Sequence, residues 1–162
     1  MIQKAVLGLG SNIGNREENL SRAIRAIELL PGTTVIAASR FYETPPFDVV
    51  SEQNEYMNCC VQILTEFSPK VLLGACLGIE TGMGRERLEY HGARIIDIDL
   101  LLYEGQSCND TELKLPHPQI LKRAFVMVPL SDIFPDKVAL GLDFSQALAK
   151  VDASGIQVLK KD

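Results

Sequence analysis

The stretch Arg94-Ile95-Ile96-Asp97-Ile98-Asp99-Leu100-Leu101-Leu102-Tyr103 organises the rest of this sequence. Branched and apolar residues fill it and neither Gly nor Pro interrupts it, which predicts a β-strand. Because side chains alternate between the two faces of a strand, one face is expected to be apolar throughout, with Ile96, Ile98, Leu100 and Leu102. The opposite face begins with Asp97 and Asp99.

The two aspartates of this strand are candidate metal ligands. Residues i and i+2 lie roughly 6.5–7 Å apart on the same side of a strand, so two carboxylates there can share one hard cation or hold two. Mg²⁺ is often held by one or two carboxylates together with substrate phosphates. On spacing alone, a half-exposed strand with a solvated polar face is the simpler interpretation. The nearby arginines Arg85, Arg87 and Arg94 favour a joint metal and phosphate site.

Bulk composition is typical of a soluble globular protein. The 162 residues, 46% of them apolar and 23% charged, suit one domain covering residues 1–162. The net charge of −5 argues against a protein that grips many nucleic-acid phosphates. We find neither a signal-peptide pattern nor an apolar run long enough to span a membrane. The four cysteines form no C-x-x-C pair, so a cytoplasmic protein with free thiols is expected.

Hydrophobic patterning predicts the order β-α-β-β-α-β with a C-terminal addition. Strands are expected at residues 5–10, 33–43, 56–67 and 94–103, and helices begin after the capping residues Asn15 and Ser68. A short apolar helix is expected at 124–130, and the tail is expected to hold a small helix at 144–150 and a strand at 156–159. This order predicts an α+β, ferredoxin-like fold, in which helices pack on a mainly antiparallel sheet in three α-β-α layers.

The glycines of the first strand do not form a dinucleotide-binding loop. Gly8, Gly10 and Gly14 are spaced G-x-G-x-x-x-G, which is one residue too long, and no acidic ribose ligand follows where it is expected. We therefore disfavour a dinucleotide site.

Seven short segments form an ordered set along the chain. The segments are Gly10-Ser11-Asn12, Phe41-Tyr42-Glu43-Thr44-Pro45-Pro46, Tyr56-Met57-Asn58, Gly84-Arg85-Glu86-Arg87, Gly92-Ala93-Arg94-Ile95-Ile96-Asp97-Ile98-Asp99, Pro116-His117 and Arg123-Ala124-Phe125. No single segment is decisive, but the ordered set is highly specific and extends to about Leu130. It resembles the 6-hydroxymethyl-7,8-dihydropterin pyrophosphokinase family.

The resemblance implies transfer of an intact pyrophosphoryl group from ATP to the hydroxymethyl oxygen of a reduced pterin, with release of AMP. By analogy, Asp97 and Asp99 would hold two Mg²⁺ ions that bridge the triphosphate. Arg85 and Arg94 would join them as catalytic residues, since the guanidinium fork binds two phosphate oxygens at once. The implied ATP-binding residues are Glu80, Arg87, His117 and Arg123. Without the resemblance, a turn histidine between two prolines would be the preferred interpretation of His117.

The resemblance also implies a pterin site. The flat ring would lie between Tyr56 and Phe125, with Asn58 at its edge. Thr44, Pro45 and Phe47 would complete the set. Without the resemblance, Phe125 would be assigned to the core, and Tyr56 and Asn58 could equally form an ordinary strand end.

The chain departs from the family pattern in three places. His91 stands where a Trp is usual, the segment from Arg87 to Gly92 is one residue shorter, and Glu112 replaces a residue that is often basic. Segments 44–55 and 84–93 are polar, long and flank the site, and we expect both to close over bound ATP.

Two rival functions are weighed against the enzyme. The first is a non-catalytic nucleotide-binding or regulatory module, a common use of this fold. The second is an RNA-binding sheet, which the acidic net charge and the lack of an aromatic RNP-like run disfavour. The expected partners are small-molecule substrates, without nucleic acid or membrane, and a monomer is the default.

Overall fold

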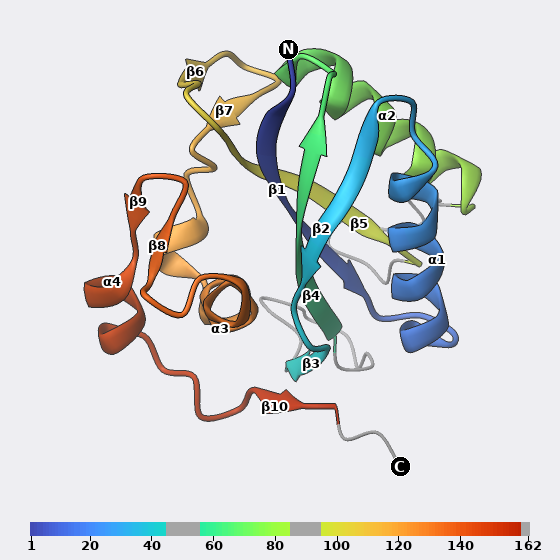
Figure 1. Cartoon of the computed structure of the whole chain (residues 1–162). Coiled ribbons are helices and arrows are strands. Elements are labelled where there is room, and N and C mark those ends of the chain that lie inside the picture. The colour runs from blue at the N-terminus through green and yellow to red at the C-terminus, as the bar shows by residue number, and fades with distance from the viewer. Residues whose placement is uncertain (45–55, 85–94, 160–162) are drawn as a thin grey trace.

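The computed structural model describes residues 1–44, 56–84 and 95–159 of the chain (Figure 1). The strands are β1 (Gln3–Ser11), β2 (Thr33–Ala38), β3 (Tyr42–Thr44), β4 (Tyr56–Thr65), β5 (Asp97–Tyr103), β6 (Cys108–Asn109), β7 (Lys114–Leu115), β8 (Val138–Ala139), β9 (Leu142–Asp143) and β10 (Gln157–Val158). The helices are α1 (Arg16–Glu28), α2 (Pro69–Gly82), α3 (Ala124–Ile133) and α4 (Ser145–Lys150), with a 3₁₀ turn at Ile120–Lys122.

One antiparallel sheet forms the centre of the molecule, with the strand order β10-β3-β4-β1-β5. Strand β1 lies in the middle and pairs with β4 on one side and β5 on the other. Strand β2 pairs with the C-terminal half of β4, and β3 pairs with its N-terminal end. This arrangement confirms the predicted α+β, ferredoxin-like fold.

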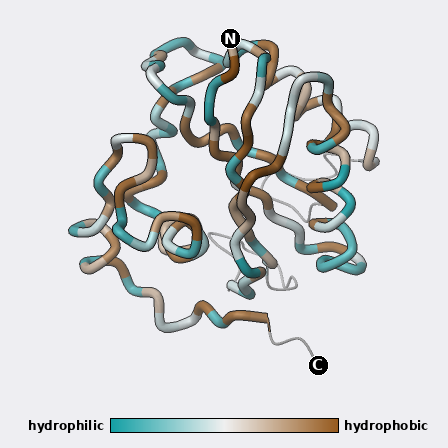
Figure 2. Tube along the Cα trace, viewed as in Figure 1, coloured by the Kyte–Doolittle hydropathy of each residue, from teal (hydrophilic) through white to brown (hydrophobic). Residues whose placement is uncertain are grey.

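Helices cover both faces of the sheet, as predicted (Figure 1). Helices α1 and α2 lie over one face, where buried residues such as Leu7, Leu20 and Leu72 form a first core. Helix α3, with α4 beside it, lies over the other face, where Val6, Met127 and others form a second core. Figure 2 shows that hydrophobic segments of the strands run between these two layers.

The predicted helix starts are confirmed at their capping residues. The Asn15 side chain accepts a hydrogen bond from the backbone N–H of Glu18 at 3.0 Å. At the start of α2, the Ser68 hydroxyl accepts from the backbone N–H of Val71 at 3.4 Å. Both side chains satisfy a donor that the first turn of a helix leaves without an intrahelical partner. The α3 and α4 helices and the final strand also form close to their predicted positions.

The single strand predicted at residues 33–43 is instead two strands, β2 and β3. At the break, the backbone N–H of Ser39 donates to the carbonyl of Cys60 at 2.9 Å. The Ser39 hydroxyl accepts from the backbone N–H of Cys60, also at 2.9 Å. Serine can satisfy backbone groups with its side chain, and here it replaces a ladder bond where the edge changes from β2 to β3.

Strand β5 contains a bulge that the alternation rule did not predict. Val6 of β1 pairs with Leu102 and Leu7 pairs with Leu100, so Leu101 is an extra residue in the ladder. After this point the side chains exchange faces: Leu102 joins Leu101 in the second core, and Tyr103 enters the first. The prediction that Leu102 continues the apolar face of Ile96, Ile98 and Leu100 is therefore wrong.

Two short hairpins complete the chain, β6–β7 before the 3₁₀ turn and β8–β9 after α3. Within the described residues, no helix has the length and apolar character needed to cross a membrane.

Candidate active site

Two glycines in the central strand make the floor of the site. Gly8 of β1 lies beside Asp99 of β5, and Gly10 lies between Asp97 of β5 and Asn58 of β4. Because glycine has no side chain, β1 leaves a shallow trough between these neighbouring strands. A Cβ atom at Gly10 would lie 2.8 Å from Asn58 Oδ1. The close approach explains why this strand position carries no side chain.

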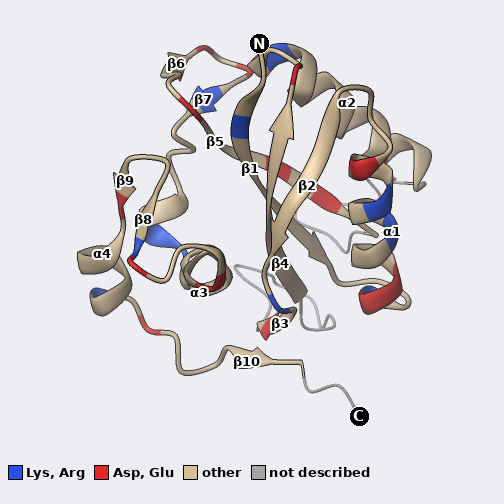
Figure 3. Cartoon of the chain, in the orientation of Figure 1, with Lys and Arg blue, Asp and Glu red and all other residues tan. Residues whose placement is uncertain are grey.

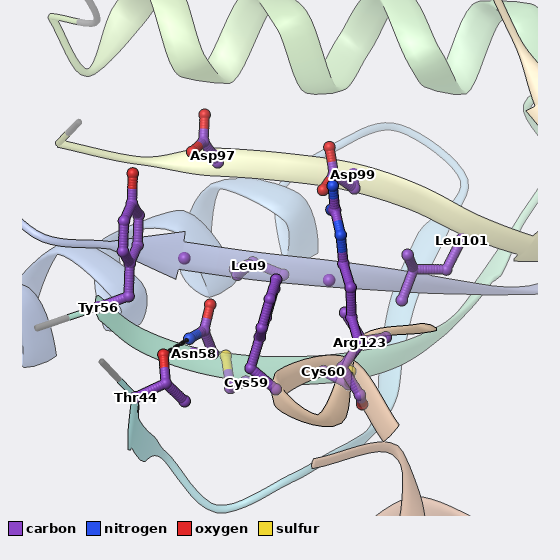
Figure 4. Close-up of a pocket in the computed structure, with 14 residues that line it drawn as sticks. Leu9, Thr44, Tyr56, Asn58, Cys59, Cys60, Asp97, Asp99, Leu101 and Arg123 are labelled. Carbon is purple, nitrogen blue, oxygen red and sulfur yellow. Dashed lines mark hydrogen bonds between the residues drawn. The ribbon is translucent and has the colours of Figure 1, made fainter. Parts of the chain in front are cut away.

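A pocket opens over this floor, on the face of the sheet that α3 covers (Figure 4). It brings together these predicted site residues: Thr44, Tyr56, Asn58, Asp97, Asp99, Arg123 and Phe125. Sequence reasoning missed the other lining residues, which are Gly8, Leu9, Gly10, Cys59, Cys60, Leu101 and Val126. The spacing Gly-x-Gly within an apolar strand was the available signal, since interior glycines mark places where another group approaches the backbone closely.

One end of the pocket holds a buried amide and hydroxyl. Asn58 Nδ2 donates to Thr44 Oγ1 at 2.8 Å, which links β4 to β3 (Figure 4). Both residues are buried. The bond orients the amide so that its oxygen lies above Gly10, at the pocket floor. A fixed amide that can both donate and accept suits the polar edge of a heteroaromatic ring.

Aromatic rings reach this end of the pocket from two layers of the molecule. Tyr56 begins β4, opposite Thr44, whereas Phe125 belongs to the first turn of α3. The guanidinium of Arg123 lies over the Phe125 ring, 5.5 Å from its centre. This cation–π contact favours a ring and a cation that face the pocket together. The pocket therefore offers aromatic surface from the sheet side and from the α3 side.

The other end of the pocket carries the two carboxylates of β5 (Figure 4), a strand whose acidic positions are red in Figure 3. Asp97 is partly buried and Asp99 is exposed. Both also line a groove that continues past the edge of β5 toward Glu80 and His117. Within the described residues, no three Asp, Glu, His or Cys side chains gather as a closed metal cage. Two open carboxylates fit Mg²⁺ bound jointly with substrate phosphates.

Glu80 ties α2 to the strand that carries the aspartates. Its side chain is buried, and Glu80 Oε2 accepts from the backbone N–H of Ile98 at 2.7 Å. Ile98 lies directly between Asp97 and Asp99. The contact therefore holds the backbone between the two carboxylates against α2. A role for Glu80 in ATP binding stays a prediction.

His117 lies in the groove in a defined tautomer. Its Nδ1 accepts from the backbone N–H of Gln119 at 3.1 Å, so in the neutral imidazole the proton is on Nε2. Burial lowers the pKa of His117 below its usual value; Asp99 opposes this shift and Arg123 adds to it. The backbone N–H of His117 donates to the carbonyl of Leu101 at 2.9 Å. The bulged strand thus anchors a neutral donor beside the carboxylates.

Comparison with known proteins identifies the family to which this chain belongs. Residues 6–135 match the family model described as 7,8-dihydro-6-hydroxymethylpterin-pyrophosphokinase, HPPK. The chain belongs to the HPPK family. The match includes every described residue of the pocket, from Gly8 of β1 to Val126 of α3.

Curated HPPK relatives match nearly the whole chain. A 2-amino-4-hydroxy-6-hydroxymethyldihydropteridine pyrophosphokinase from Methylorubrum extorquens is 46% identical over 154 residues, which is 95% of this chain and 97% of the relative. One from Haemophilus influenzae is 38% identical over 134 residues, or 83% of each chain.

Solved HPPK-DHPS structures share the fold. One of them, in complex with substrates, superposes with a TM-score of 0.69 at 13% identity over 91% of this chain. A Plasmodium falciparum HPPK-DHPS chain also gives a TM-score of 0.69, at 14% identity over 93% of this chain. This chain spans less than half of those longer proteins, 43% and 45% of them respectively.

Several predicted HPPK site residues lie outside the described residues. They are Pro45, Phe47, Arg85, Arg87 and Arg94, and most of the two segments expected to close over ATP lies there too.

One departure from the HPPK pattern can be placed. Glu112 lines the groove beside β5 together with Lys114. The Lys70 ammonium contacts Asp110 at 2.8 Å and Glu112 at 3.6 Å. This part of the groove therefore carries both acidic and basic side chains. Its acidic residue Glu112 stands at a position where the family often has a basic residue.

Proposed function

We propose that the chain transfers the pyrophosphoryl group of ATP to the hydroxymethyl oxygen of 6-hydroxymethyl-7,8-dihydropterin, giving AMP and the pterin diphosphate for folate biosynthesis. One observation carries the proposal. A single trough over Gly8 and Gly10 joins the Asn58 end, suited to a flat polar ring, to the Asp97 and Asp99 end, suited to a metal-bound polyphosphate. The family membership and the names of the close relatives agree with this assignment.

The reaction requires positioning and neutralisation of charge more than covalent chemistry by the protein. The pterin oxygen attacks the β-phosphorus of ATP, the bond from that phosphorus to the oxygen of the α-phosphate breaks, and AMP leaves with the bond's electron pair. The hydroxyl proton is released. Asp97 and Asp99 would hold Mg²⁺, proposed as two ions, whose charge lowers the cost of bringing the nucleophile to the phosphates.

The protein's own groups surround these positions. His117 Nε2–H would donate to nucleotide phosphates from the groove, and the Arg123 guanidinium would donate to them from the pocket. Asn58 and Thr44 would fix the edge of the pterin, and Tyr56 and Phe125 would pack on its faces. We also assign Glu80, Arg85, Arg87 and Arg94 to the nucleotide side, and Pro45 and Phe47 to the pterin side, as implied by the family resemblance.

We further propose that residues 1–162 act as one domain and as a cytoplasmic monomer, with small-molecule substrates and without nucleic acid or a membrane. The net charge of −5 supports the part of this proposal that concerns nucleic acid and membrane surfaces.

A product assay tests the function. The full chain is mixed with ATP, Mg²⁺ and 6-hydroxymethyl-7,8-dihydropterin, and nucleotide products are separated by chromatography. AMP formed in equal amount to the pterin diphosphate, and only when pterin is present, is the expected result. ADP would indicate ordinary kinase chemistry, and the absence of both would favour a binding module.

A further inference from the structure

A polar joint connects strand β3 to helix α3. Both carboxylate oxygens of Asp132 are engaged: Arg40 donates to Oδ1 from Nη2 at 3.0 Å and to Oδ2 from Nε at 3.1 Å. The backbone N–H of Arg40 also donates to Oδ2 at 3.0 Å. The Tyr42 hydroxyl lies 2.8 Å from Oδ1 and 2.9 Å from Oδ2, and donates to this carboxylate. We call this arrangement the Asp132 joint.

The joint lies outside the pocket, but each of its elements carries a pocket residue. Asp132 follows Phe125 by seven residues on α3, which is two turns along nearly the same helix face, about 10.5 Å away. Tyr42 precedes Thr44 by two residues, so both side chains lie on the same face of β3. Tyr42 also pairs in register with Asn58. A shift at the joint is therefore transmitted to both sides of the ring-binding end.

Helix α3 depends on tertiary contacts for its exact placement. Pro129 lies within the helix and has no N–H, so it cannot make the bond that would tie the turn of Phe125 to the next turn. The buried side chains Met127 and Leu130 hold the helix on the sheet, but apolar contact is not directional. The Asp132 joint supplies directional, charge-assisted hydrogen bonds. These bonds fix both the distance of α3 from the sheet and the rotation of α3 about its own axis.

We propose that Asp132 is a positioning residue for the pterin site, because its contacts with Arg40 and Tyr42 set the width of the gap between Phe125 of α3 and Tyr56, which pairs with Thr44 of β3. A flat ring held between two surfaces requires a gap of one ring thickness, so a small displacement of α3 weakens pterin binding. On the nucleotide side, β5 and the His117 turn are not in contact with the joint, whereas Arg123 is the N-cap residue of α3 and would move with that helix. The inference rests on the proposed function and adds a residue to it.

The same strand offers a matched control on its other face. Arg16 Nη2 of α1 contacts Glu43 Oε1 at 2.7 Å, and both side chains are partly buried. This ion pair also ties β3 to a helix, but to α1 rather than to α3. Loss of the Glu43 charge therefore tests whether any weakening of β3 is enough to disturb the site.

The experiment compares Asp132→Asn, Tyr42→Phe and Glu43→Gln with the wild-type chain. Steady-state AMP formation is measured with pterin varied at saturating ATP and with ATP varied at saturating pterin. We expect Asp132→Asn to lower kcat/KM for pterin by about 10- to 100-fold through KM, the size of loss that a misplacement remote from the chemistry can cause. KM for ATP should change less, because Arg123 is the one nucleotide-side residue among those described that lies at α3. Tyr42→Phe should give a smaller change of the same kind, and Glu43→Gln none.

A double variant and a binding assay complete the test. Tyr42→Phe combined with Asp132→Asn should cost less than the sum of the two single effects, because both act through one joint. Pterin affinity is also measured by fluorescence titration with a non-hydrolysable ATP analogue and Mg²⁺, which needs no turnover. If the wild type forms no AMP, the proposed function is wrong. The pterin affinities from the titration then test the role of the Asp132 joint on their own. If Asp132→Asn does not fold, Tyr42→Phe decides.

Two results would overturn the proposal. One is a folded Asp132→Asn protein whose pterin affinity equals that of the wild type. The other is a Glu43→Gln protein that loses as much pterin affinity as Asp132→Asn, because that would show general loosening of β3 rather than control of the gap by α3.

Discussion

Gly10 lies in β1 with Asn58 on one neighbouring strand and Asp97 on the other. A methyl group at this position would meet Asn58 Oδ1 at 2.8 Å, and it would displace the amide from its bond with Thr44. We predict that Gly10→Ala raises KM for the pterin by about tenfold or more, since a small misplacement of a positioning group costs that much. Steady-state kinetics with pterin varied measures this effect.

Gly74 on α2 provides the control for the same substitution. No heavy atom lies within 4 Å of the position its Cβ would occupy. Gly74→Ala should therefore leave KM unchanged and stabilise the protein by about 0.5–1 kcal/mol, because alanine is the better helix residue. If both variants lost pterin affinity equally, the close approach at Gly10 would not be the cause.

The carboxylates of β5 give a second prediction at the residue scale. Asp99→Ala should reduce AMP formation by at least about 100-fold, because the group that holds the metal against the phosphates is lost. The side chain is exposed, so the free energy of unfolding should change by no more than about 0.5 kcal/mol. Asp97→Ala should likewise abolish turnover with little loss of fold. Product assays and urea denaturation check both parts, and near-normal turnover in either variant would remove that residue from the metal site.

At the scale of elements, the hydrogen bond that joins α2 to β5 gives a prediction for stability. Glu80 accepts the backbone N–H of Ile98 in a buried setting, and Glu80→Leu would leave that donor without its acceptor. We predict a loss of about 1–3 kcal/mol in the free energy of unfolding for Glu80→Leu. Glu80→Gln keeps an amide oxygen in place and should lose less. Equal losses in the two variants would mean that the hydrogen bond is not what Glu80 contributes.

The Asp132 joint predicts a dependence of stability on pH. Burial alone raises the pKa of Asp132, but hydrogen bonds from Arg40 and Tyr42 outweigh it and hold the pKa below its usual 3.8. A carboxylate whose pKa is lower in the folded than in the unfolded protein stabilises the folded state. This contribution is complete at pH values above the unfolded-state pKa, and it is lost as the pH falls through the folded-state pKa. The groups that face it, Arg40, Tyr42 and the Cys60 thiol, do not titrate in that range.

We therefore predict that Asp132→Asn is less stable than the wild type near pH 7, and that the difference narrows below about pH 4. Urea denaturation at pH 7, 5, 4 and 3 measures the free energy of unfolding of both proteins. A difference that stays constant down to pH 3 would show that the charge on Asp132 contributes nothing.

Elements that depend on local contacts could be predicted from the sequence, whereas elements that depend on distant contacts could not. The starts of α1 and α2 follow from Asn15 and Ser68, because a cap acts on residues only two or three positions away. The division of β2 from β3 depends on Ser39 meeting Cys60, which is 21 residues further along the chain. The bulge at Leu101 likewise depends on pairing with β1. Neither contact leaves a pattern in the sequence near it.

At the scale of the whole molecule, the sheet order follows from the β-α-β-β-α-β sequence of elements, and this was predictable. The candidate site could be predicted only in part. Asp97 and Asp99 indicated a metal site only together with the arginines just upstream. Phe125, by contrast, meets Thr44 and Asn58 only because α3 folds back over the sheet. Residue patterns favoured a core role for Phe125, and its place in the pocket was expected from the family resemblance alone.

The distribution of exposed apolar side chains supports a monomer. The exposed large hydrophobic residues among those described come from six places: Val71 and Leu77 from α2, Met1 and Ile2 from the N-terminus, and single residues from the end of α1, β2, the 3₁₀ turn and β8, namely Leu29, Ile36, Leu121 and Val138. Scattered single residues of this kind do not make an interface. We predict a sedimentation mass close to 17.8 kDa at micromolar concentration. A concentration-independent mass of twice that value would contradict the prediction.

The extra residue at Leu101 limits how this protein can be altered. Removing or adding one residue between Asp99 and Tyr103 would not simply change the length of β5. Removal of Leu101 would leave Leu100 opposite Leu7 and Leu102 opposite Val6, but it would take one side chain out of the second core and remove the carbonyl that accepts the backbone N–H of His117. Variation here should therefore tolerate exchange of one side chain for another far better than any insertion or deletion.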